Sequence, residues 1–170
     1  LDLADNYFAK ADYHSALSHY TLAAAGGKQL PRLYVGMGDT LRLSGQPESA
    51  EIAYQNALVE DANLTRAHIG LAILATNKGE LDTAIASYQK AIDSSTTSIE
   101  PYLGIGRIYT EQKRHSDAIA AYQIVVLYHS QNGMAWAGLG QNWLALGNRE
   151  EALTAFERAL LCTPVAATTY

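Results

Sequence analysis

The residues that most often carry out chemistry are few in this sequence, and they lie far apart. The five histidines fall at unrelated places, and none has another histidine four residues away or a cysteine partner, as a metal site on a helix requires. The sole cysteine, Cys162, excludes an internal disulfide and a cysteine-rich zinc site. No serine stands in the glycine-flanked turn of a hydrolase nucleophile. The sequence therefore predicts a protein that is not an enzyme and that binds no metal or cofactor.

Glycines spaced two apart could begin a dinucleotide-binding turn, and they occur as Gly36/Gly38, Gly104/Gly106 and Gly138/Gly140. Each pair lacks the third glycine and a preceding strand, so nucleotide binding is disfavoured. The first glycine of each pair recurs, together with Gly70, in the middle of a predicted helix, where it costs about 1 kcal/mol relative to alanine. That cost predicts a close approach to the backbone, by a neighbouring helix in preference to a ligand.

Composition excludes two further classes of function. Lys and Arg total 12 against 17 Asp and Glu, and the formal net charge of −5 argues against non-specific nucleic-acid binding, which needs a basic surface. No apolar run approaches the ~20 residues of a membrane span.

The elements that must position any site repeat every 34 residues. Three columns run through the chain without a gap: Ala16, Ala50, Ala84, Ala118, Ala152; Tyr20, Tyr54, Tyr88, Tyr122, Phe156; and Ala23, Ala57, Ala91, Val125, Ala159. Upstream of three of these alanines, Gly45, Gly79 and Gly147 predict a left-handed turn at a helix end. Each unit is thus a helix A, a turn and a helix B, and because one hairpin cannot bury its own apolar face, the hairpins must stack. In this interpretation the alanines and tyrosines serve stacking and carry no binding specificity.

These columns resemble the tetratricopeptide repeat family, most fully in the last unit, which reads Trp136, Leu139, Gly140, Trp143, Ala152, Phe156, Ala159 and Pro164. The resemblance implies an all-α, right-handed solenoid of five hairpins in a single array over 1–170. The predicted units are 1–30, 31–64, 65–98, 99–132 and 133–166, with a tail at 167–170. Both ends are expected to continue into a longer chain or to lie against a partner, self-association included. Gly26 and Gly27 should end the first helix B early, and Lys113 replaces the turn glycine of the fourth unit.

In this family the A helices line a groove for a peptide or an amphipathic helix, which makes protein the expected partner, without nucleic acid or a small-molecule substrate. Carried onto this sequence, the predicted groove residues are Arg32, Val35, Asp39, Arg42, Arg66, Ile69, Ile73, Leu103, Arg107 and Gln141. Asp5 and Phe8 occupy the corresponding places in the first unit. Because Asp5 and Asp39 stand where a carboxylate-gripping relative carries asparagine, a receptor for chaperone tails is disfavoured. Val35, Ile69 and Leu103 are interpreted as an apolar stripe for a partner, with padding between helices as the alternative.

A finer resemblance lies in residues 33–41 (LYVGMGDTL) and 67–72 (AHIGLA), which are similar to bacterial pilus-assembly TPR lipoproteins of the tight-adherence type. It implies a periplasmic protein, tethered to the outer membrane by a lipidated cysteine upstream, that helps to assemble a secretin ring. The alternative that stays open is a cytoplasmic adaptor or secretion chaperone.

Overall fold

The computed structural model of the chain describes residues 1–27, 30–95 and 97–162, and over these ranges every regular element is a helix. Two compact units are present, Leu1–Thr96 and Thr97–Tyr170. The predicted tail at 167–170 and Pro164 of the predicted repeat pattern lie outside the described residues. None of the helices in the described ranges is long and apolar enough to cross a membrane.

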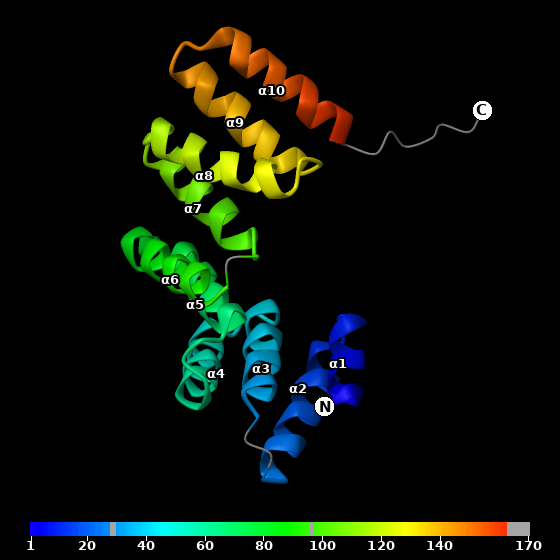
Figure 1. Cartoon of the computed structure of the whole chain (residues 1–170). Coiled ribbons are helices and arrows are strands. Elements are labelled where there is room, and N and C mark those ends of the chain that lie inside the picture. The colour runs from blue at the N-terminus through cyan, green and yellow to red at the C-terminus, as the bar shows by residue number, and fades with distance from the viewer. Residues whose placement is uncertain (28–29, 96, 163–170) are drawn as a thin grey trace, which may run out of the picture. The chain divides into compact units, whose positions relative to one another are not determined.

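The first unit contains three helical hairpins (Figure 1). They are α1 (Asp2–Ala9) with α2 (Tyr13–Ala25), α3 (Pro31–Leu43) with α4 (Pro47–Glu60), and α5 (Thr65–Lys78) with α6 (Leu81–Ser94). Successive hairpins touch through α2 with α3 and α4 with α5, and the A helices α3 and α5 also contact each other. Helix α2 ends at Ala25, before the two glycines, as predicted.

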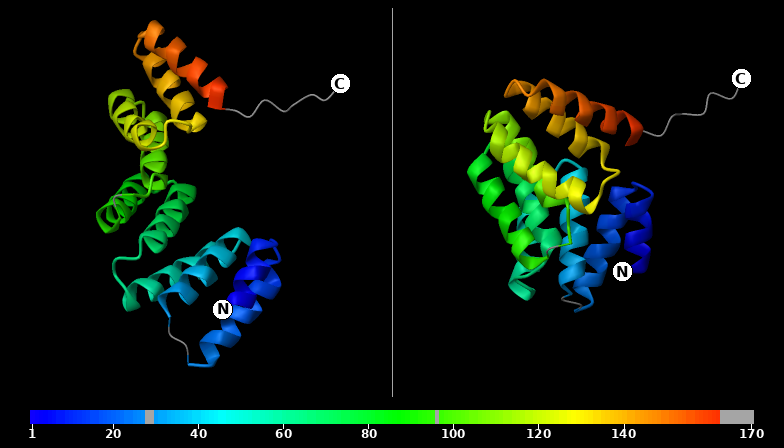
Figure 2. Two further views of the ribbon diagram at one scale, coloured as in Figure 1. Left: turned by 45° about the vertical axis from the view of Figure 1, so that its right-hand side comes forward. Right: turned by 45° about the horizontal axis from the view of Figure 1, so that its top comes forward.

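The second unit contains two hairpins, α7 (Glu100–Glu111) with α8 (His115–Tyr128), and α9 (Gly133–Ala145) with α10 (Arg149–Cys162). Figures 1 and 2 show α9 and α10 side by side along their length, and α8 joins the two hairpins by contacting α9. The grouping of all five hairpins into one array with the stated unit boundaries stays a prediction.

The turn inside every hairpin uses one backbone conformation at one repeat position. Gly45, Gly79 and Gly147 have φ of +78°, +78° and +85°, which confirms the predicted left-handed turns. Ala11 and Lys113 occupy the same position in the other two hairpins and adopt φ of 58° without the advantage of glycine. The turn geometry is therefore imposed by the hairpin, and glycine only makes it less costly.

Small residues let the helices of each hairpin approach closely. The first alanine column, Ala16 to Ala152, is 0–2% exposed throughout. Prolines at the first turn of α3, α4 and α7 begin helices where no backbone N–H is needed. Acidic residues in the first turn of α4, α6, α8 and α10 lie where the helix dipole favours negative charge.

Candidate functional site

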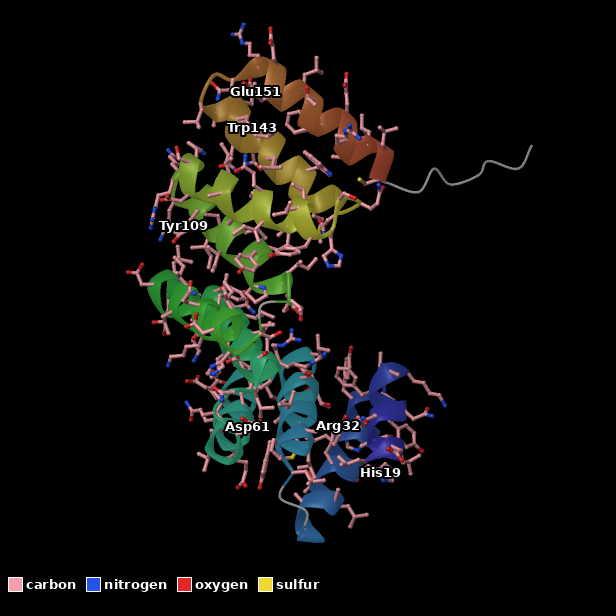
Figure 3. The ribbon with its side chains drawn as sticks, in the orientation of Figure 1. His19, Arg32, Asp61, Tyr109, Trp143 and Glu151 are labelled. Carbon is pink, nitrogen blue, oxygen red and sulfur yellow. The ribbon has the colours of Figure 1, made fainter. Side chains whose placement is uncertain are left out.

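A hollow of about 300 Å³ lies on the A-helix side of the first unit. Its walls come from α1, α2, α3 and α5, and its lining residues are Asp5, Phe8, Tyr20, Arg32, Val35, Gly36, Asp39 and Arg66. Figure 3 shows Arg32 projecting from α3 on the side of the α1–α2 hairpin. In this hollow a ligand could meet both apolar and charged groups.

Tyrosine rings packed on glycines hold the site in place. A Cβ added to Gly38 would lie 2.6 Å from the Tyr54 ring, and one on Gly70 of the next hairpin would also overlap that ring. Tyr20 lies in the same way against Gly36, at 2.6 Å. Gly36 and Gly70 thus leave room for the tyrosine ring of a neighbouring helix B. This confirms the predicted close approach of a neighbouring helix at both positions. Because the rings are 2% and 0% exposed, their hydroxyl positions are closely determined.

The Tyr54 hydroxyl emerges beside a buried carboxylate. It donates a hydrogen bond to Asp39 Oδ1 at 2.8 Å, and Arg66 Nε donates to Asp39 Oδ2 at 2.7 Å. Arg42 adds a bond from its Nε to the Tyr54 oxygen at 3.3 Å and lies 3.7 Å from Asp39 Oδ1. Asp39 is therefore bonded through both oxygens, as a carboxylate with a 7% exposed side chain must be.

The same arrangement occurs one repeat earlier. The Tyr20 hydroxyl donates to Asp5 Oδ1, and Arg32 Nη2 donates to Asp5 Oδ2, both at 2.5 Å. Each member precedes its counterpart by one 34-residue repeat, so the Tyr–Asp–Arg cluster is a repeated feature of the first unit. In the third repeat the sequence ends the series, because Ile73 stands at the aspartate position and Glu100 at the arginine position.

Burial raises the pKa of Tyr20 and of Tyr54 well above the ordinary value for a phenol. For Tyr20 the hydrogen bond to Asp5 adds to the effect of burial, and for Tyr54 the negative charge of Asp39 does so, partly opposed by the hydrogen bond from Arg42. Both hydroxyls consequently stay protonated at neutral pH and act as hydrogen-bond donors to the carboxylates.

The charged groups of the two clusters differ sharply in exposure. The Asp39 and Asp5 side chains are 7% and 32% exposed, whereas those of Arg66 and Arg32 are 66% and 72% exposed. The carboxylates therefore lie at the base of the clusters, and the guanidinium groups form the surface that a ligand meets.

Four of the ten predicted groove residues line this hollow: Arg32, Val35, Asp39 and Arg66. Arg42 supports it through Tyr54 and Asp39. Val35 and Ile69 are only 7% and 6% exposed, so little of either is available to a partner, and Ile73 is half-buried. Packing between helices accounts for most of their surface, and a binding role for the predicted apolar stripe stays a prediction.

The remaining predicted residues belong to the second unit. Leu103 is half-buried and packs against the cluster around Tyr122, while Arg107 and Gln141 are exposed. Among the described residues of this unit, the side chain of Asn142 is fully buried, and it donates to the Thr110 hydroxyl and the Gly138 carbonyl, each at 2.8 Å. Because its amide nitrogen is thus occupied in donating, its oxygen accepts from His115 Nδ1 at 2.8 Å.

The sequence predicts that the tyrosines serve stacking alone, and this prediction is wrong for two of them. Tyr20 and Tyr54 also hold the site carboxylates through their hydroxyls. The sequence contains this signal, because Asp5, Tyr20 and Arg32 are each followed 34 residues later by the same residue type, and the set does not occur a third time.

His68 and Cys162 each lie close to a backbone carbonyl group. His68 is 8% exposed and its Nε2 lies 2.9 Å from the Ala62 carbonyl oxygen, so its imidazole is packed within the unit. Cys162 is half-buried, 3.8 Å from the Ser130 carbonyl oxygen. Within the described ranges, no three His, Cys, Asp or Glu side chains are grouped so that they could hold a metal ion.

Helical hairpins that recur at one period and contact their neighbours define the class of helical-repeat proteins. The hollow described above lies on the A helices of these hairpins. A family model described as "Tetratricopeptide repeat" matches residues 35–99 and 103–167, well over half of the chain. The chain belongs to the tetratricopeptide repeat family, whose members are in general non-catalytic scaffolds that bind peptides or proteins.

Solved structures share this fold. MamA is 24% identical, with 95% of each chain covered and a TM-score of 0.83. YrrB, a TPR protein with an unusual peptide-binding site, is 17% identical, with 96% of this chain and 84% of that chain covered and a TM-score of 0.73. The C-terminal part of a TPR repeat-containing protein from Cytophaga hutchinsonii is 20% identical, with 95% of this chain and 64% of that chain covered and a TM-score of 0.81. No curated protein sequence matches the chain. The predicted fold class, an all-α solenoid of tetratricopeptide hairpins, is confirmed.

Proposed function

We propose that the chain binds a segment of another polypeptide in the hollow on the A-helix side of its first unit. The observation that carries the proposal is the hollow itself, whose apolar lining is Phe8 with a small exposed part of Val35, and whose charged edge is Arg32 and Arg66. Apolar anchors with a polar edge are how grooves of this kind hold peptides. The peptide-binding site named for YrrB supports the proposal by analogy of fold alone.

The site is pre-formed, which favours binding. Tyr20 and Tyr54 are fixed between helices, and each holds a carboxylate that in turn holds an arginine. Side chains that are already ordered lose less conformational entropy when a ligand arrives, a saving of about 0.5–1.5 kcal/mol for each long side chain.

Site-specific photocrosslinking tests this function. The photoreactive residue p-benzoylphenylalanine is placed at position 8, in the hollow, in cells that produce the full-length protein. The matched control carries it at position 22, because Leu22 lies on the same hairpin, is 69% exposed and does not line the hollow. We expect a discrete polypeptide adduct at position 8 that is absent at position 22 and is lost when purified unlabelled protein competes. Identical adducts at both positions, or none at position 8, would contradict binding in the hollow.

We propose further that the polypeptide belongs to a pilus or secretion assembly at the bacterial outer membrane, with the chain in the periplasm. The support is the similarity of residues 33–41 and 67–72 to pilus-assembly TPR lipoproteins. The alternative is a cytoplasmic adaptor or secretion chaperone. Fractionation of the native cell decides between them, since recovery with the outer membrane supports the first and recovery with the cytosol contradicts it.

A further inference from the structure

We infer that the polypeptide segment bound in the hollow is acidic, and that Arg32 and Arg66 recognise two of its carboxylates. This inference rests on the binding function proposed above and adds the chemistry of the partner.

The two arginines are presented as a pair. Arg32 lies at the start of α3 and Arg66 at the start of α5, and both line the same hollow. Each is held by an aspartate of the preceding A helix, Asp5 in one case and Asp39 in the other. An arginine that is anchored in this way keeps its planar guanidinium in one orientation, which suits bidentate bonding to a carboxylate.

The aspartates do not compete for the ligand. Asp39 has a hydrogen bond on each oxygen and a 7% exposed side chain, so a basic ligand would have to displace Arg66 to reach it. Asp5 likewise has each oxygen bonded, one to Tyr20 and one to Arg32. Arg32, by contrast, is 72% exposed and bonds Asp5 through one terminal nitrogen, while a guanidinium carries five N–H donors. The donors that face solvent therefore favour an anionic group.

Long-range charge does not reverse this preference. The chain carries a formal net charge of −5, which repels an acidic peptide at a distance. At physiological ionic strength the Debye length is about 8 Å, so distant repulsion between exposed charges is largely screened. The contact between a carboxylate and an anchored guanidinium is short and is screened much less.

The spacing of the two helices that carry the arginines suggests the form of the segment. Helices α3 and α5 are in contact, and packed helix axes lie about 8–10 Å apart. A polyproline II segment has three residues per turn and a rise of about 3.1 Å, so residues i and i+3 share one side about 9 Å apart. Two acidic residues three positions apart would match the pair, with the residues between them facing Val35 and Phe8.

Three fluorescent peptides of the pattern Leu-Xaa-Leu-Pro-Xaa-Leu test the inference when Xaa is Glu, Gln or Lys. Fluorescence anisotropy with the full chain should give a Kd for the Glu peptide that is about 10-fold lower than for the Gln peptide, with the Lys peptide weakest. That factor corresponds to two partly exposed ion pairs of ordinary strength. The ratio should fall as salt rises, because exposed guanidinium groups are screened.

The variants Arg32→Gln and Arg66→Gln should each reduce the preference for Glu over Gln, and the double variant should abolish it. Arg114→Gln is the matched control, because Arg114 also bonds a carboxylate, that of Asp117 at 2.7 Å, but lies in the second unit. Arg32→Gln is the safer variant for folding, since Asp5 is 32% exposed and water can replace the arginine. Circular dichroism checks that each variant is folded.

The outcomes separate the two proposals. Equal binding of the Glu and Gln peptides, tightest binding of the Lys peptide, or a Glu preference that survives in the double variant overturns the acidic inference and leaves peptide binding standing. If none of the three peptides binds, and position 8 gives no specific crosslink, the proposed function fails as well.

Discussion

The two units pack their tyrosines in the same way and surround the hydroxyls with different chemistry. Tyr54 in the first unit and Tyr122 in the second each lie against two glycines, Gly38 and Gly70 in one case and Gly106 and Gly138 in the other. The Tyr54 hydroxyl bonds a buried carboxylate. Tyr122 instead interacts with the neutral Thr110, whose hydroxyl donates to the Gly106 carbonyl and accepts from Asn142. Burial raises the pKa of both tyrosines. A shared scaffold thus supports an ionic cluster in one unit and an uncharged network in the other.

The residues at the equivalent groove positions reinforce this difference. Arg107 takes the place of Asp39, and Met134 that of Arg66, and both are exposed. The second unit therefore lacks the carboxylate that would anchor an arginine on the next helix. The stacking residues can therefore stay constant, while single substitutions on the A helices decide where a charged site forms.

Truncating the shared ring should have the largest effect. We expect Tyr54→Ala to lower the free energy of unfolding by about 3–5 kcal/mol, because it leaves a cavity between two helices and removes a donor from Asp39. Tyr122→Ala should cost somewhat less, since no carboxylate depends on it. Urea unfolding followed by far-UV circular dichroism measures both. Equal losses would show that the ionic cluster contributes little beyond packing.

Removing only the tyrosine hydroxyl separates its polar contribution to stability from the packing of the ring. Tyr54→Phe should cost about 1.5–3 kcal/mol, as expected for a hydrogen bond to a charged group, and Tyr122→Phe about 0.5–1.5 kcal/mol. Both tryptophans of the chain, Trp136 and Trp143, lie in the second unit. Tryptophan fluorescence therefore reports unfolding of that unit, while circular dichroism reports both. A Tyr122→Phe loss as large as that of Tyr54→Phe would contradict the comparison.

Glycine at the two turns that lack it should stabilise each unit by a similar amount. Ala11→Gly in the first unit and Lys113→Gly in the second should each raise the free energy of unfolding by about 1 kcal/mol, because both residues hold a left-handed backbone. Thermal and urea unfolding provide the measurement, and Gly79→Ala, at φ +78°, is the reverse control. A destabilising effect at Lys113 would indicate that its side chain makes a contribution larger than the backbone strain.

Breaking the exposed ion pairs should have the smallest effect on the free energy of unfolding. Lys78 pairs with Glu51 in the first unit, and Arg114 pairs with Asp117 in the second, each at 2.7 Å and 37–50% exposed. Lys78→Ala and Arg114→Ala should each change the stability by no more than about 1 kcal/mol, and by less at high salt. Denaturation at two salt concentrations checks this. A larger loss for either would mark a pair that supports its unit through packing of the side-chain stem.

Particular residues show which features of the fold and of the site can be predicted from the sequence. It predicts the turn at Gly79, because a left-handed residue before helix B follows from the repeat position. It also placed Asp39 and Arg66 among the groove residues, through the family resemblance. It did not predict that Tyr54 would join them, because Tyr54 is separated from Asp39 by 15 residues and was assigned to packing.

The repeat period, the helices and their turns can be read from the sequence, since they depend on the local spacing of alanine, aromatic and glycine residues. The bonding of Asp39 by Tyr54 from its own hairpin and by Arg66 from the next, 27 residues away, depends on how the hairpins stack. The physical reason is that a carboxylate removed from water must find donors, and only the stacking of successive hairpins brings these donors to it. That requirement leaves the arginines, and not the aspartates, at the surface of the hollow.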